Sequence, residues 1–90
     1  MVHKRIRVSG KVQGVFYRAS AKRKADELDL IGWVKNDDDG TISIYVAGEE
    51  EIVNEFIEWC KTGPPMAEVS KVDVEEAEEE KLNGFEQRRS

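Results

Sequence analysis

Residues 31–47 read IGWVKNDDDGTISIYVA, two apolar segments separated by an acidic turn that contains Gly40. In the second segment every other residue is Ile or Val, which is the two-residue period of a strand with one buried face. The run of aspartates followed by glycine favours a tight reversal of the chain. We therefore expect strands over 31–36 and 41–47, joined by a turn at 37–40.

The sequence on each side of this hairpin adds one helix and one strand. Residues 3–9 alternate between apolar and charged, whereas 18–30 and 49–60 carry apolar residues at helical spacing. Valines within 69–74 indicate a fourth strand, and 82–85 could add a short last one. The order β-α-β-β-α-β predicts an α+β, ferredoxin-like sandwich, with two helices packed on one face of an antiparallel sheet.

Several conspicuous residues are expected to serve the scaffold. The acidic run 75–80 is a solvated strand end or connection, and Trp33 and Trp59 anchor helix to sheet. Cys60 lies on the apolar stripe of the second helix and is expected to be a small core residue. The aspartates at 37–39 fit a hairpin turn better than a metal site, because no matching ligand spacing accompanies them.

The 90 residues, with 14 Lys and Arg against 19 Asp and Glu, have a net charge of −5. This length predicts a single domain over 1–90, and the acidic balance argues against nucleic-acid binding. A lone cysteine and the lack of a long apolar segment predict a cytoplasmic protein without membrane contact. The charge is uneven, because 1–25 contain eight bases and no acid, while 26–90 have a net charge of −13.

The basic end contains the segment GKVQGVFYR at 10–18, between an expected strand and an expected helix. Glycines let backbone N–H groups converge, a helix start adds unpaired donors, and Arg18 can grip an oxyanion. These parts describe a phosphate cradle, although the Walker and dinucleotide patterns are absent. A glycine-bearing turn with Arg18 capping the helix or solvated is the alternative from the residues alone.

Two segments of the chain resemble signatures of the acylphosphatase family. GxVQGVxYR within 10–18 is similar to one signature, and GWVKNxxxGxI within 32–42, followed by Gly48, is similar to the other. The resemblance extends over nearly the whole chain and implies a ferredoxin-like domain of about this size. It also implies hydrolysis of acyl phosphates to a carboxylate and inorganic phosphate.

The resemblance also implies roles for particular residues. Arg18 would be the catalytic, phosphate-binding arginine, and Asn36 would position the attacking water, approaching the loop from the hairpin side. Backbone N–H groups of the loop would hold the phosphate, and the implied phosphate-binding residues are Lys11, Val12, Gln13, Gly14, Val15, Phe16, Tyr17 and Arg18. Phe16 and Tyr17 would brace the loop.

The resemblance also implies that no metal and no cofactor take part. Because a carboxylate leaves readily without protonation, the reaction has little need for a general acid. The expected partner is a small-molecule acyl phosphate, with inorganic phosphate as product and competitive inhibitor, and we expect a monomer. A non-catalytic sensor or accessory domain is an alternative, since similar domains begin larger carbamoyl-transfer proteins. An RNA-binding module is disfavoured because only Tyr45 points outward from the third strand to stack bases.

The sequence departs from the family pattern at its end. After Phe85, Gln87 occupies a position where the pattern has an aliphatic residue. This departure leaves the packing of the last strand open.

Overall fold

The computed structural model of this chain describes residues 1–89. Its elements are β1 (Val2–Lys11), α1 (Tyr17–Glu27), β2 (Ile31–Asn36), β3 (Ile42–Gly48), α2 (Glu50–Thr62), β4 (Glu68–Glu76) and β5 (Phe85–Arg88). The predicted order of the first six elements is confirmed. The helix expected over 18–30 ends three residues early, before Asp29 takes a left-handed conformation with φ of 55°.

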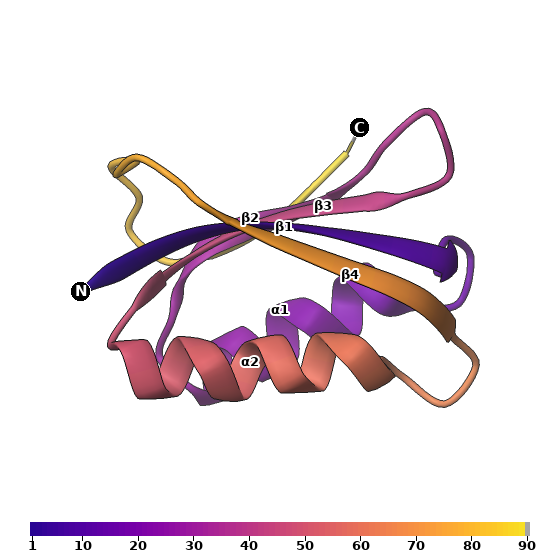
Figure 1. Cartoon of the computed structure of the whole chain (residues 1–90), viewed down its shortest axis with the longest axis horizontal. Coiled ribbons are helices and arrows are strands. Elements are labelled where there is room, and N and C mark those ends of the chain that lie inside the picture. Colours follow the sequence, from indigo (N-terminus) through magenta and orange to yellow (C-terminus); the bar gives the residue numbers. More distant parts are fainter. Residues whose placement is uncertain (90) are drawn as a thin grey trace.

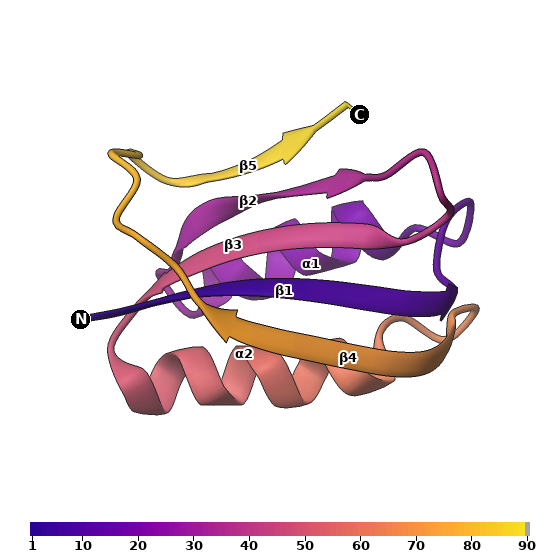
Figure 2. The same ribbon diagram turned by 45° about the horizontal axis from the view of Figure 1, so that its top comes forward.

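The strands form one sheet with the order β4-β1-β3-β2-β5, as Figure 2 shows. β1 is antiparallel to β3 and β4, and β3 is antiparallel to β2. The ferredoxin-like α+β fold is confirmed, with one correction: β5 runs parallel to β2, so the sheet is mixed. The chain leaves β4 at one edge and crosses to the other edge through residues 77–84, which sets this direction (Figure 2).

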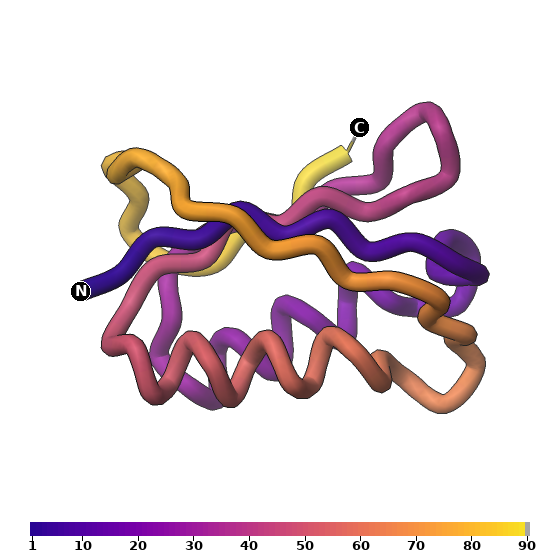
Figure 3. The backbone as a smooth tube through the Cα atoms, in the orientation of Figure 1, coloured from indigo at the N-terminus to yellow at the C-terminus, as the bar shows by residue number. Residues whose placement is uncertain are grey.

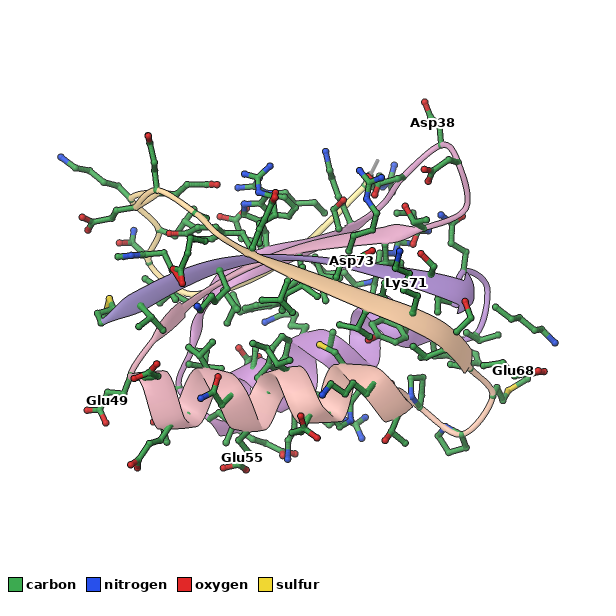
Figure 4. The ribbon with its side chains drawn as sticks, viewed as in Figure 1. Asp38, Glu49, Glu55, Glu68, Lys71 and Asp73 are labelled. Atoms are coloured by element: carbon green, nitrogen blue, oxygen red, sulfur yellow. The ribbon has the colours of Figure 1, made fainter. Side chains whose placement is uncertain are left out.

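Both helices pack on the same face of the sheet, and the main core lies between the two layers (Figures 1 and 3). The predicted alternation of β3 is confirmed, because its Ile and Val side chains at 42, 44 and 46 are all buried in this core. The charged side of α2 faces away from the sheet, as Glu55 shows in Figure 4. The buried side of α2 consists of Val53, Phe56, Ile57 and Cys60.

Cys60 is buried without a disulfide partner, as predicted for a small core residue. Burial raises the pKa of its thiol to about 12, so the thiol is protonated and unreactive at neutral pH.

The opposite face of the sheet carries a second, smaller apolar cluster. The rings of Trp33 and Tyr45 stack at 6.3 Å, and Ala77 and Leu82 pack against them. The Glu80 carboxylate accepts a hydrogen bond from Trp33 Nε1 at 3.0 Å, and its backbone N–H donates to the Tyr45 hydroxyl at 2.9 Å. The expectation that Trp33 anchors a helix is therefore wrong, because strand alternation places it on the face away from the helices.

Trp59 packs on the helical side. Its ring lies 5.4 Å from Tyr17 of α1 and 6.0 Å from Phe56 of α2. It therefore joins the two helices next to the start of α1.

The last strand forms three residues later than the sequence predicted, at Phe85–Arg88 instead of 82–85. Phe85 is buried against Phe56, with ring centroids 5.9 Å apart. The core contact of this one aromatic residue fixes where pairing with β2 begins.

No helix in the described residues is long and apolar enough to cross a membrane. The cytoplasmic location, the single-domain boundary and the monomeric state stay predictions.

Candidate active site

A cavity of about 240 Å³ lies where β1 leads into α1. The β2–β3 turn and the end of β5 lie at the same end of the sheet (Figure 2). The cavity is lined by Val12, Gly14, Phe16, Tyr17, Arg18, Ala19, Asn36 and Gln87. The structure thus brings Arg18 and Asn36, 18 positions apart in the sequence, to one cavity with part of the glycine-bearing loop.

The loop between β1 and α1 turns through two residues with positive φ, Gly14 at 76° and Phe16 at 67°. Glycine adopts such angles freely, whereas a residue with a Cβ loses about 1–2 kcal/mol. Phe16 is 71% exposed, so burial of its ring does not offset this strain. Alternating backbone angles of this kind direct N–H groups into a concavity, and strained residues of this kind cluster at binding sites.

The start of α1 adds further donors to the cavity. Its N-cap residue, Phe16, makes no side-chain capping hydrogen bond, and its first turn contains no acid. The unpaired N–H groups and the positive end of the helix dipole are therefore free to meet an anion.

Two side chains hold the loop in place from opposite sides. Gln13 Nε2 donates to the backbone carbonyls of Asp37 and Thr41, both at 2.8 Å, and so ties the loop to the β2–β3 turn. The buried Tyr17 hydroxyl donates to the Cys60 carbonyl at 2.8 Å, which ties the loop to α2. Burial raises the pKa of Tyr17 far above its usual value, so this hydroxyl is a permanent donor.

Arg18 is held by the last strand. Its Nη1 donates to the carbonyl of Arg88 at 2.9 Å, and its other N–H groups make no hydrogen bond to residues 1–89. Among residues 1–89 no carboxylate forms an ion pair with Arg18. The charge of the guanidinium is therefore available to a ligand.

Asn36 is the last residue of β2, and it pairs with Ile42 of the hairpin. Strand alternation places it on the helix-facing side together with Val34, which is buried in the main core. Its Oδ1 is buried and has no hydrogen-bond partner within the described part of the chain. Such an unsatisfied amide oxygen costs about 1–3 kcal/mol, so the side chain gains from a polar partner.

The remaining predicted phosphate-binding residues do not line the cavity with their side chains. Lys11 is an exposed residue at the end of β1 and pairs with Glu68, Val15 is in the core, and Gln13 bonds the hairpin. Tyr17 braces the loop as expected, whereas Phe16 is largely exposed. The predicted roles of Lys11, Gln13 and Val15 concern their backbone N–H groups and stay predictions.

Sequence reasoning missed two lining residues, Ala19 and Gln87. From the sequence, Gln87 stands out only as a departure from the family pattern in the last strand. Its spacing of two from Phe85 could have located it, because both residues then share the helix-facing side of β5.

The acidic turn serves the hairpin. Asp37 Oδ2 accepts hydrogen bonds from the hydroxyls of Thr41 and Ser43, and hydrogen bonds from Thr41 lower the pKa of Asp39. Asp38 points away from the molecule at the tip of the turn (Figure 4). Within residues 1–89 no group of three or more His, Cys, Asp or Glu side chains is arranged to hold a metal ion.

Fold and cavity together define a ferredoxin-like domain whose loop donors and Arg18 guanidinium suit an oxyanion. The chain matches the acylphosphatase family model over residues 4–87. It is 52% identical to the acylphosphatase of Acaryochloris marina over 79 residues, which cover 88% of this chain and 85% of that protein. The chain belongs to the acylphosphatase family, whose enzymes act on small acyl phosphates.

Two solved structures agree with this assignment. The acylphosphatase of Coxiella burnetii has a TM-score of 0.93 at 44% identity, covering 97% of this chain and 92% of that one. The acylphosphatase of Bacillus subtilis has a TM-score of 0.94 at 38% identity, covering 98% and 99%.

Proposed function

We propose that this chain hydrolyses the carboxyl–phosphate bond of acyl phosphates. The 10–18 loop and Arg18 hold the phosphate, and Asn36 positions the attacking water. The observation that carries this proposal is the shared cavity, which Arg18, Asn36 and the loop all line.

Phosphate binding rests on short-range donors. The loop and the start of α1, which has no side-chain cap, line one cavity with Arg18, whose guanidinium makes no ion pair within residues 1–89. During phosphoryl transfer, negative charge spreads over the equatorial oxygens, and fixed donors of this kind stabilise it without reorganisation.

Water positioning rests on the amide of Asn36. Asn36 lines the cavity, and its Oδ1 has no hydrogen-bond partner within residues 1–89, so the amide has unused hydrogen-bonding capacity. A water fixed by this amide attacks phosphorus in line with the bond that breaks.

The chemistry asks for no general acid. Water forms a bond to phosphorus, the bond from phosphorus to the acyl oxygen breaks, and its electron pair leaves with the carboxylate. The conjugate acid of that leaving group has a pKa of about 4–5, so the carboxylate departs unprotonated. Both water hydrogens remain on the phosphate product until solvent takes one.

The test is the steady-state hydrolysis of benzoyl phosphate by Arg18→Ala and Asn36→Ala. We expect kcat/KM to fall about 100- to 1000-fold for each. Arg18→Ala should also weaken competitive inhibition by inorganic phosphate, whereas Asn36→Ala should mainly lower kcat.

Two exposed residues on the helices provide matched controls. Arg23→Ala and Asn54→Ala remove the same residue types outside the cavity, and both should retain activity. A folded Arg18→Ala variant with nearly normal kinetics, checked by circular dichroism, would contradict the proposal.

A further inference from the structure

Gln87 lies on the same side of the sheet as Asn36. Phe85, two residues earlier in β5, is buried in the core under the helices, so Gln87 faces the helical layer as well. In the parallel pairing of β5 with β2, Gln87 lies beside Val34, which shares its face with Asn36. The two amide side chains therefore extend from neighbouring strands into one cavity.

The side-chain amide of Gln87 makes no hydrogen bond that stabilises the fold within residues 1–89. Its side chain is exposed, and neither its oxygen nor its nitrogen makes a hydrogen bond there, in contrast to Gln13, whose nitrogen bonds two carbonyls. The backbone that carries it is fixed, because Arg88 accepts the hydrogen bond from Arg18. A positioned strand thus presents an unused polar group to the cavity.

The geometry of in-line attack determines whether the Gln87 amide lies near the attacking water or near the acyl group. The attacking water and the departing acyl oxygen lie on opposite sides of phosphorus. If Asn36 holds the water, then β5, which pairs with the strand of Asn36, lies on the same side of phosphorus as the water. The acyl group then points away from Asn36 and from Gln87. Gln87 is therefore placed for the water and not for the acyl chain.

A water molecule aimed at phosphorus must keep one lone pair free while its two O–H bonds find acceptors. One amide cannot fix both O–H bonds, since it offers one oxygen. We propose that Gln87 is a second water-orienting residue, whose Oε1 accepts a hydrogen bond from the attacking water. This inference rests on the proposed function. Gln87 takes no proton, and both hydrogens leave on the phosphate product.

The test compares Gln87→Leu and Gln87→Glu with the unaltered chain, using benzoyl phosphate. Gln87→Leu loses the acceptor, so kcat should fall roughly 3- to 10-fold while KM and inhibition by phosphate stay within twofold. Gln87→Glu keeps an acceptor but adds a negative charge, so kcat should stay within twofold while KM rises. Leu is close in size and the site is exposed, so unfolding by urea should be unchanged.

Glu86→Gln is the matched control, because Glu86 lies on the same strand and faces the opposite side of the sheet. It should leave both kinetic constants unchanged. An unchanged kcat in Gln87→Leu, or an equal loss in the control, overturns the inference. If Arg18→Ala and Asn36→Ala lose activity as expected in the same assays, a negative result for Gln87→Leu overturns only the role of Gln87. If Arg18→Ala and Asn36→Ala keep their activity, the proposed function itself is wrong.

Discussion

Gly10 and Gly14 flank the same loop but are constrained for different reasons. Both have positive φ, 119° and 76°. A Cβ at Gly10 would collide with the Glu68 carbonyl and lie 2.7 Å from the nitrogen of Ser70, in the neighbouring strand β4. A Cβ at Gly14 would meet no atom within 4 Å. Close approach therefore dictates glycine at the first position, and backbone angle alone at the second.

This difference predicts unequal costs for the same substitution. Gly10→Ala should lower the free energy of unfolding by about 2–4 kcal/mol, because strain and collision add. Gly14→Ala should lower it by about 1–2 kcal/mol, the cost of the left-handed angle. Urea denaturation of the two variants measures both values, and equal losses would contradict the explanation.

At the scale of elements, Gln13 connects the loop after β1 to the β2–β3 turn through two hydrogen bonds. Gln13→Leu keeps the side-chain volume but leaves both carbonyls without this donor. We expect a loss of about 1–3 kcal/mol in unfolding free energy and a severalfold rise in KM, because the loop is no longer held in its binding shape.

Thr41→Val is the control for this element. It removes the hydroxyl bonds to Asp37 and Asp39 but keeps the backbone carbonyl that Gln13 contacts. Its KM should match that of the unaltered chain. A similar rise in KM for both variants would mean that the turn itself, and not its link to the loop, shapes the site.

The elements also show which parts of the fold a sequence can reveal. The hairpin was predictable because apolar and polar residues alternate over 41–47, and this two-residue period follows directly from the local geometry of a strand. The packing of residues 77–84 over the second cluster was not predictable. Their acidic composition indicates a solvated connection, whereas Ala77 and Leu82 contact that cluster. Those contacts depend on where the chain crosses from one sheet edge to the other, which no local pattern encodes.

The candidate site was predictable in a similar, partial way. The two motifs located Arg18 and Asn36, and the structure places both at one cavity. The motifs could not show that Arg18 is held by the Arg88 carbonyl, or that Gln87 joins the lining. Both features come from β5, whose parallel pairing with β2 is a property of the complete sheet.

At the scale of the whole molecule, the loop and the arginine of the site come from the basic part of the chain. Residues 1–25, with eight bases and no acid, form β1, the loop and most of α1. The remainder has a net charge of −13, and acids such as Glu49, Glu68 and Asp73 lie at separate places over the surface (Figure 4). Because salt screens exposed charges beyond about 8 Å, substrate binding must depend on the local donors of the cavity.

The most direct test of this account is a crystal structure with saturating inorganic phosphate. We expect the phosphate in the 10–18 loop, about 2.7–3.1 Å from loop N–H groups and from Arg18, with a water bonded to Asn36 on its far side. Phosphate bound elsewhere, or a loop that stays empty while phosphate inhibits the enzyme competitively, would contradict the central claim.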